Sequence, residues 1–284
     1  MKKILTMLLT VLMATVAIFA VGCSSTEDSS VVDPRKGNTI VVGYTVYAPM
    51  NYTEDKVLVG FDTELALMTF EALGYNVQFK CITWDNKYID LAEGTIDCIW
   101  NGFTSNGEDK VDGVPTSRNQ IVDFSYNYMQ NAQCILRKSS TPAITDPAQF
   151  DGKTIAVERG SSGDSLASSY KTGDVDISIS ALASQMDAVT KVNEGICDYA
   201  IVDVLLAEAI LAGSGYSNLV INTGLSIGIE YYAIGFKKVE GENKLRDNVN
   251  KTLEYFAETG YLQTLANKYN LGTSVITDFT SQKI

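Results

Sequence analysis

The chain has 284 residues, 45% of them hydrophobic, and a formal net charge of −12. This length and composition are enough for one large domain or two lobes with a sizeable core. The acidic balance argues against nucleic-acid binding, and the absence of histidine excludes Ser-His or Cys-His catalysis and His-ligated metals.

The N-terminus has the pattern of an export signal. Two lysines precede the apolar run Ile4–Val21, which small residues and Cys23 follow. Ala20-Val21-Gly22-Cys23 resembles the lipobox of bacterial lipoproteins, with alanine where leucine is usual. We therefore expect a signal peptide at 1–22, cleavage before Cys23 and a lipid on its thiol. A single membrane-spanning helix is the alternative, because the run is near the ~18-residue threshold.

A polar tether is expected after the lipid. Residues 23–37 are rich in serine, threonine and aspartate, a composition typical of a flexible linker. Removing the leader removes two lysines and no acid, which takes the net charge from −12 to −14. An acidic body held at a membrane by lipid fits these numbers.

Strands and helices alternate in the next segment. Thr39–Tyr44 is a β-branched run typical of a buried strand. Asp62 is expected to cap a helix that ends before Gly74, and a strand and a short helix to Glu93 follow. With the strand IDCIW, this order predicts a parallel sheet covered by helices.

The second half repeats this order. The expected strands are NAQCILRK, TIAVERG, DISISA, CDYAIVD, NLVIN and YYAIGF. The expected helices are Asp164–Tyr170, Ser184–Asn193, Val204–Ala212 and two amphipathic helices within Glu242–Tyr269. The chain is therefore expected to form two α/β units and a C-terminal helical segment.

Four cysteines besides Cys23 lie in apolar, strand-like segments and none forms a CxxC pair. We expect buried free thiols, although the even count leaves disulfides open. These residues are Cys81, Cys98, Cys134 and Cys197.

An ordered series of segments resembles the polar amino-acid-binding family of extracellular solute-binding proteins, the receptor subunits of ABC importers. The series is YAPM, GFDTEL, AEGTIDCIWNGFT, TSRNQIVDFS, FDGKTIAVERGSSG, CDYAIVD, YYAIGF and ETGYLQTLANKY. It covers about Thr39 to Leu271, and it is the order and spacing of the whole series that carries the resemblance.

The resemblance implies the type II periplasmic-binding-protein fold, with two α/β lobes, two crossing strands and a ligand cleft between the lobes. The crossings would fall near Tyr128–Asn131 and Glu230–Ala233. Lobe one would then comprise residues 38–129 plus 231–284, and lobe two residues 132–229. In such sheets, ligands bind at the carboxyl ends of parallel strands.

The resemblance also implies where the charged groups of an amino acid would bind. Arg118 would pair with the carboxylate through its planar fork, and Ser161 and Ser162 would assist at a helix N-terminus. Asp203 would bind the ammonium. The alternatives are a surface arginine, an ordinary Gly/Ser cap, and an aspartate that caps the following helix.

The remaining expected contacts come from lobe one. The resemblance places Asn101, Gly102 and Thr104 on the ammonium and carboxylate, with Gly102 allowing close backbone approach. Tyr47 and Trp84 would enclose the ligand's side chain, although Trp84 could be a core residue instead. No residue is expected to hold a metal or another cofactor.

Two departures from the family pattern concern the cleft. The thirteen residues 105–117 form an apparent insertion at the cleft rim, which could cover the site or contact a partner. Residues 43–46 lack the aspartate with which the family's receptors for basic amino acids read the side chain. Glu158 and Arg159 could each reach the side chain and suggest opposite charges, so we favour an uncharged polar L-amino acid.

The predicted function is the substrate-binding lipoprotein of an amino-acid ABC importer, a monomer on the extracytoplasmic face of the bacterial cell membrane. Its partners would be the permease and ATPase subunits and a free L-amino acid captured by lobe closure. The alternatives are an amino-acid-sensing receptor subunit and an enzyme resembling cyclohexadienyl dehydratases, for which Glu158 is the local acid-base candidate.

Overall fold

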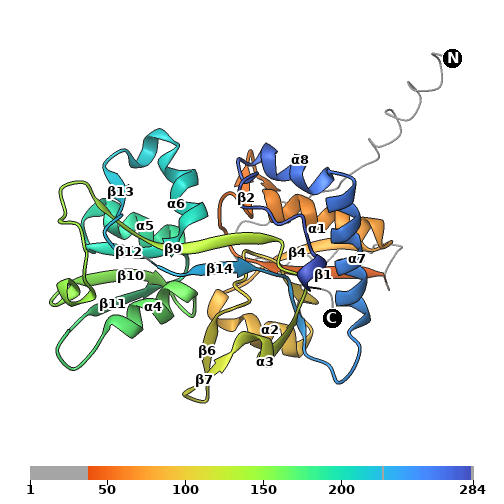
Figure 1. The fold of residues 1–284 in the computed structure, drawn as a ribbon, viewed down its shortest axis with the longest axis horizontal. Coiled ribbons are helices and arrows are strands. Elements are labelled where there is room, and N and C mark those ends of the chain that lie inside the picture. The colour runs from red at the N-terminus through yellow and green to blue at the C-terminus, as the bar shows by residue number, and fades with distance from the viewer. Residues whose placement is uncertain (1–37, 226, 283–284) are drawn as a thin grey trace, which may run out of the picture.

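Two separate β-sheets organise the chain in the computed structural model, which describes residues 38–225 and 227–282 (Figure 1). The predicted signal peptide at 1–22, the tether at 23–37 and the lipidation of Cys23 lie outside these residues. Within the described part of the chain, no helix is long and apolar enough to cross a membrane.

The first sheet has the strand order β4-β1-β5-β15-β8. Strand β1 lies parallel to β4 and β5, whereas β15 is antiparallel to both β5 and β8. Helices cover both faces, which explains why β1 is almost continuously apolar. The strands are β1 (Thr39–Tyr44), β4 (Asn76–Cys81), β5 (Cys98–Ile99), β8 (Val122–Phe124) and β15 (Gly235–Lys237).

The second sheet has the order β11-β10-β12-β9-β13. Strand β10 lies parallel to β11 and β12, and β9 runs antiparallel to β12 and β13. Here too, two helical layers enclose the sheet. The strands are β9 (Met129–Lys138), β10 (Thr154–Glu158), β11 (Ser178–Leu182), β12 (Tyr199–Asp203) and β13 (Leu219–Ile221).

Two antiparallel strands connect the sheets. Strand β14 (Ile229–Tyr232) pairs with the first half of β9, and both run between the lobes in Figure 1. The segment YYAIGF was expected to be one strand, which is wrong. It divides after Tyr232 because β14 pairs with β9, whereas β15 pairs with β5 and β8 of the first sheet.

Eight helices surround the sheets in the described residues. Helices α1, α7 and α8 pack together beside the first sheet, and α2 lies against β5 and β15. Helices α4 and α5 contact the strands of the second sheet, and α6 lies against β9. The helices are α1 (Phe61–Ala72), α2 (Lys87–Glu93), α3 (Arg118–Ile121), α4 (Ser162–Tyr170), α5 (Gln185–Glu194), α6 (Val204–Leu211), α7 (Lys244–Glu258) and α8 (Tyr261–Lys268).

Short elements complete the fold. Two hairpins stand outside the main sheets, and single-turn 3₁₀ helices occur at four places in the described chain. The hairpins are β2 (Tyr52–Glu54) with β3 (Val57–Val59), and β6 (Glu108–Val111) with β7 (Val114–Ser117). The 3₁₀ helices are Trp84–Asn86, Pro147–Phe150, Ser214–Tyr216 and Thr280–Gln282.

Asp62 does not cap α1 as the sequence suggested. The helix begins one residue earlier, and the carbonyls of Pro49 and Met50 accept its first N–H groups at 2.9–3.3 Å. Asp62 is instead fully buried and accepts hydrogen bonds from the Gly102 N–H (2.8 Å) and the Tyr128 hydroxyl (2.9 Å). Burial raises the pKa of Asp62 to about 7.

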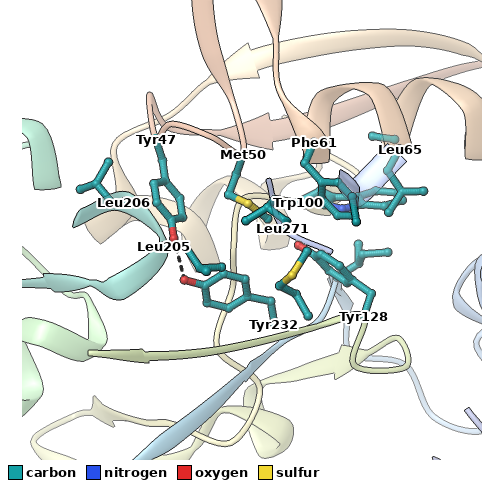
Figure 2. Close-up of a cluster of buried hydrophobic side chains, with 14 of the residues drawn as sticks. Tyr47, Met50, Phe61, Leu65, Trp100, Tyr128, Leu205, Leu206, Tyr232 and Leu271 are labelled. Atoms are coloured by element: carbon teal, nitrogen blue, oxygen red, sulfur yellow. Dashed lines mark hydrogen bonds between the residues drawn. The ribbon is translucent and has the colours of Figure 1, made fainter. Parts of the chain in front are cut away.

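The apolar core near this aspartate continues between the lobes. Figure 2 shows aromatic side chains of lobe one beside Leu205 and Leu206, which belong to α6 of the other lobe. All of these side chains belong to one buried cluster. The two lobes are therefore in contact along this side of the cleft.

Three of the cysteines are free and buried as expected: Cys98, Cys134 and Cys197. Cys81 is disulfide-bonded, so the expectation of a free thiol is wrong at that position. Cys81 is the last residue of the edge strand β4 and is only half-buried, which leaves room for a second sulfur to approach.

Replacing Asp62, which does not itself line the cavity, should destabilise lobe one. In Asp62→Ala the Gly102 N–H and the Tyr128 hydroxyl lose a buried acceptor, at a cost of about 2 kcal/mol. Urea unfolding followed by circular dichroism measures this loss. Exposed Glu71→Ala, on α1, is the control, and equal midpoints for the two variants would contradict the role given to Asp62.

Candidate ligand-binding site

A cavity between the two sheets brings the predicted ligand-binding residues together. Its lining contains all nine of them, together with three residues that were not in the predicted set. The predicted nine are Tyr47, Trp84, Asn101, Gly102, Thr104, Arg118, Ser161, Ser162 and Asp203, and the additional three are Gln133, Glu158 and Gln185. Their role as ligand contacts remains a prediction.

The lobes are closed around this cavity. The empty volume is about 300 Å³ when open solvent is included, but the centre of a water molecule can enter only about 20 Å³ of it. That space suits one or very few waters. A larger ligand therefore requires the lobes to open, and they could close again around it.

Strand ends position most of the lining. Tyr47 and Trp84 follow β1 and β4, and Asn101 follows β5. In the second sheet, Glu158 and Asp203 are the last residues of β10 and β12. The parallel strands of both sheets therefore direct their carboxyl ends at one cleft, as is general for open α/β sheets.

Arg118 forms the positive side of the cavity. It is 1% exposed, and its Nη1 donates to the Thr104 carbonyl and the Ser162 hydroxyl, both at 3.1 Å. Its Nε and Nη2 donate to the carboxylate of Asp109, at 3.1 and 2.9 Å. Lys87, 2% exposed, lies 3.6 Å from the same carboxylate. The cluster of Arg118, Lys87 and Asp109 has a formal charge of +1.

The N-terminus of α4 faces Arg118 from the second lobe. The Ser161 hydroxyl accepts the Asp164 N–H at 3.2 Å and caps the helix, which is the alternative considered for this turn. Ser162 is the first helical residue, so its N–H has no acceptor within the helix. An anion placed between Arg118 and this helix end would meet donors from both lobes.

Two carboxylates form the negative side. Asp203 and Glu230 share the Gln133 Nε2, which donates to them at 2.6 and 3.0 Å. The Asn131 Nδ2 also donates to both, at 2.7 and 3.2 Å, and Gln185 donates to Asp203. Burial, and next the charge of Glu230, raise the pKa of Asp203 to about 7. Asp203 makes no side-chain cap on α6. A cation is the group that this pair lacks.

Thr104 connects the two sides of the cavity. Its carbonyl accepts from Arg118, and its hydroxyl donates to Glu230 at 3.2 Å. Thr104 therefore contacts both the positive and the negative groups, and a small zwitterion requires opposite charges at such a short separation.

Gly102, two residues before Thr104, allows the loop to approach an aromatic wall. Gly102 has φ +57°, and a Cβ there would lie 2.6 Å from the ring of Tyr47. The Tyr47 and Tyr232 hydroxyls are 2.7 Å apart (Figure 2). The Asn101 amide is already engaged, because it bonds Thr45 and Asn51 within lobe one.

Trp84 lies between the cavity and a cation. The Lys87 Nζ sits 5.0 Å from the centre of its ring, and the edge of Phe103 packs against it. Lys87 also donates to the Gly160 carbonyl of the second lobe at 3.1 Å. Trp84 is therefore both part of a buried cluster and a wall of the site.

Only one of the two candidate side-chain readers faces the cavity. Glu158 is 4% exposed, and its Oε1 has no hydrogen-bond partner among the described residues. Burial, and next the charge of Asp203, raise the pKa of Glu158 to about 8. Arg159 is exposed and donates to the Ala181 carbonyl at 3.0 Å.

Several partners of the site were not foreseen from the sequence. Gln133 lies in the middle of strand β9, and Gln185 directly follows the cap of α5. A polar residue inside a buried strand was the available signal for Gln133. The partners Lys87, Asp109 and Glu230 depend on tertiary contacts and had no local signal.

Comparison with known proteins identifies the family. The model of bacterial extracellular solute-binding proteins, family 3, matches residues 40–272. The chain belongs to this family. The predicted membership and the two-lobed α/β fold are thereby confirmed.

Relatives of this chain are named for different amino acids. A probable histidine-binding protein of Campylobacter jejuni is 26% identical, over 95% of this chain and 100% of its own. The arginine-binding extracellular protein ArtP of Bacillus subtilis is 26% identical over 96% and 99%. A substrate-binding protein from Streptococcus pneumoniae, solved with bound histidine, has a TM-score of 0.69 and 26% identity over 83% and 93%.

A weaker match shows that the fold also occurs in an enzyme. A membrane-bound lytic murein transglycosylase of Desulfosudis oleivorans is 22% identical over 83% of this chain and 49% of its own length. Family membership alone therefore does not exclude catalysis.

The buried carboxyl of Glu158 should make stability depend on pH. Folded Glu158 keeps its proton up to about pH 8, whereas the unfolded chain releases it near 4.5. The free energy of unfolding should therefore fall as pH rises from 5 to 8, by up to about 1.4 kcal/mol per pH unit for this group. Urea titrations at several pH values should show that the free energy of unfolding falls less steeply with pH in Glu158→Gln than in wild type.

The control for this slope is Glu71→Gln, which removes an exposed glutamate of α1 and should leave the slope unchanged. Identical slopes for wild type and Glu158→Gln would mean that water reaches the Glu158 carboxyl in solution.

Proposed function

We propose that the chain is the substrate-binding component of an ABC importer and captures one free L-amino acid by closure of its lobes. The observation that carries this proposal is the contact of Thr104 with both sides of the cavity. An α-amino acid carries its carboxylate and ammonium on one carbon, so it needs opposite charges at this short separation. A neutral solute would leave both sides unmatched.

In the proposed complex, the carboxylate lies between Arg118 and the N-terminus of α4, and the ammonium lies at Asp203 and Glu230. Arg118 belongs to lobe one and Ser162 and Asp203 to lobe two, so a bound amino acid contacts both lobes. Only contacts made in the closed form can favour closure, and this ligand would supply them from both sides. The importer's membrane subunits would then recognise the closed form.

For the side chain we propose an uncharged polar group. Residues 43–46 offer no acid, and Glu158 with a pKa near 8 is protonated at pH 7, so it can donate to or accept from a neutral group. The names of relatives that bind histidine and arginine make the cationic class the rival. A screen of ligands decides between the two classes directly.

A thermal-shift screen of the twenty L-amino acids and cystine tests the function. A ligand at ~100 times its dissociation constant adds about 2.7 kcal/mol of stability and raises the melting temperature. We expect a shift with neutral polar amino acids and a smaller one with lysine or arginine. A largest shift with a basic amino acid would overturn the side-chain class, and no shift at all would overturn the function.

Arg118 should be essential for the binding that the screen detects. Arg118→Ala should raise the dissociation constant by at least about 30-fold, because the ligand's buried carboxylate loses its charged partner. Arg118→Lys should fail similarly, since lysine lacks the planar fork. Isothermal titration calorimetry measures both, with the surface variant Arg246→Ala as control. Wild-type affinity in Arg118→Ala would refute the assignment.

We also propose that in the mature chain the Cys23 thiol carries the lipid rather than taking part in a disulfide, and that the chain works at the outer face of the cell membrane. Cys23→Ala should be shed into the medium while it binds the amino acid as before, because the lining residues described for the cavity belong to the two lobes. Immunoblots of membrane and medium fractions measure this. Retention of Cys23→Ala in the membrane would favour the spanning-helix alternative for the leader.

An enzyme is the second candidate, and the buried Glu158 is the observation that favours it. A carboxyl with a pKa near 8 in a closed cavity could act as a general acid. Incubation with prephenate or arogenate separates the functions, since a dehydratase would release carbon dioxide and water from them. The amino-acid receptor would return both compounds unchanged.

A further inference from the structure

The hairpin β6–β7 forms the socket of the cleft arginine. This hairpin lies within the insertion 105–117 and ends at Ser117, directly before Arg118. The Arg118 N–H donates to the Gly107 carbonyl at 3.0 Å, so the start of the hairpin folds back over the arginine. In Figure 1 the hairpin lies beneath the strands that connect the lobes, and β6 contacts α4 of lobe two.

Three surfaces of the socket hold the guanidinium. The ring of Phe103 lies on one side, with its centre 5.4 Å from Cζ. Gly107 packs against the group so closely that a Cβ there would lie 3.1 Å from Cζ and Nη1. Asp109 binds the Nε and Nη2 edge in the bidentate manner typical of arginine and carboxylate.

Asp109 therefore already occupies one edge of the group expected to bind the ligand. It could be a plug that the ligand's carboxylate must displace, or a support that turns the other edge toward the ligand. The cavity decides between them: Arg118, Thr104 and Ser162 line it, whereas Asp109 does not. Asp109 binds the Nε and Nη2 edge of the guanidinium, whereas Nη1 bonds Thr104 and Ser162, which line the cavity.

Asp109 also holds a second cation in place. Lys87 lies 3.6 Å from it, and the Tyr88 hydroxyl donates to it. Burial alone would raise the pKa of Asp109, but Arg118 and Lys87 outweigh this effect and hold the pKa below its usual value. Both cations reach across the cleft, Arg118 to the Ser162 hydroxyl and Lys87 to the Gly160 carbonyl.

We infer that Asp109 is the positioning residue of this binding site, and that the hairpin serves to build the socket of Arg118. Asp109 fixes the orientation in which Nη1, released from the Ser162 hydroxyl when the lobes open, meets the ligand's carboxylate at the N-terminus of α4. This inference rests on the proposed function for its ligand, but the orientation of Arg118 can be measured without any ligand.

Charge and orientation predict opposite effects of Asp109→Asn. The substitution raises the formal charge of the cluster from +1 to +2, which by charge alone would tighten carboxylate binding. Loss of the bidentate partner frees the guanidinium, and a misplaced group can cost one to two orders of magnitude. If Asp109 positions Arg118, the dissociation constant should rise roughly tenfold or more.

The first test measures binding of the amino acid found in the screen and of its α-amide, which lacks the carboxylate, by calorimetry. Asp109→Asn should weaken binding of the amino acid much more than binding of the amide. Asp109→Glu should restore part of the affinity for the amino acid. Exposed Glu108→Gln on the same hairpin removes an equal charge and should change neither. Tighter binding of the amino acid to Asp109→Asn would show that Asp109 is a plug. Equally weakened binding of the amino acid and the amide would show a general structural role. Either result overturns the inference.

The second test needs no ligand, so it separates failure of this inference from failure of the proposed function. The sequence contains five arginines, and the Nε–H signal of Arg118 in a ¹H–¹⁵N spectrum is the one lost in Arg118→Lys. We expect it to exchange slowly with water in wild type and in Glu108→Gln, and to broaden or vanish in Asp109→Asn. An unchanged signal in Asp109→Asn overturns the inference even if no amino acid binds.

Discussion

The pairing of buried charges in the cleft is the constraint on which the rest of the site depends. A guanidinium that is 1% exposed cannot be left without a carboxylate, because removing one partner of such a pair costs several kcal/mol. The cavity has very little room for water, so the protein itself must supply this partner. Asp109 does so for Arg118 and Lys87, while three side-chain amides, those of Asn131, Gln133 and Gln185, donate to Asp203 and Glu230 on the other side.

The fold solves the problem of bringing these charges together by directing strand ends at one place. The parallel strands of both sheets end at the cleft, so residues far apart in the chain meet there without long loops of their own. The strands β9 and β14 between the lobes contribute Asn131, Gln133 and Glu230 to the same network. The connecting strands are therefore part of the acidic side of the cavity. A substitution in them would alter the binding site as well as the connection between the lobes.

The sequence predicted the secondary-structure elements and the charged residues of the site better than it predicted which side chains would pair with one another. The β-branched run of β1 and the glycine after α2 were enough to place both elements, because local preferences decide them. Arg118 and Asp203 could be named from the ordered resemblance. Asp62 looked like a helix cap, since only the folded loop shows that carbonyls of Pro49 and Met50 already take the helix N–H groups. Asp109 looked like one acid among several in a polar insertion, because its pairing requires the hairpin to fold back.

The protein's own charges around the cavity explain what an ammonium would contribute. Three carboxyl groups line or border the cavity at Glu158, Asp203 and Glu230, against the single net positive charge of the cluster around Asp109. Burial first, and the charge of the neighbouring carboxylate second, favour the protonated forms of Asp203 and Glu158 and raise their pKa values to about 7 and 8. An ammonium beside Asp203 replaces such a proton and leaves the carboxylate paired. Closure around a zwitterion therefore satisfies both sides at once, whereas closure without one leaves the acidic side dependent on protons that neutral water supplies poorly.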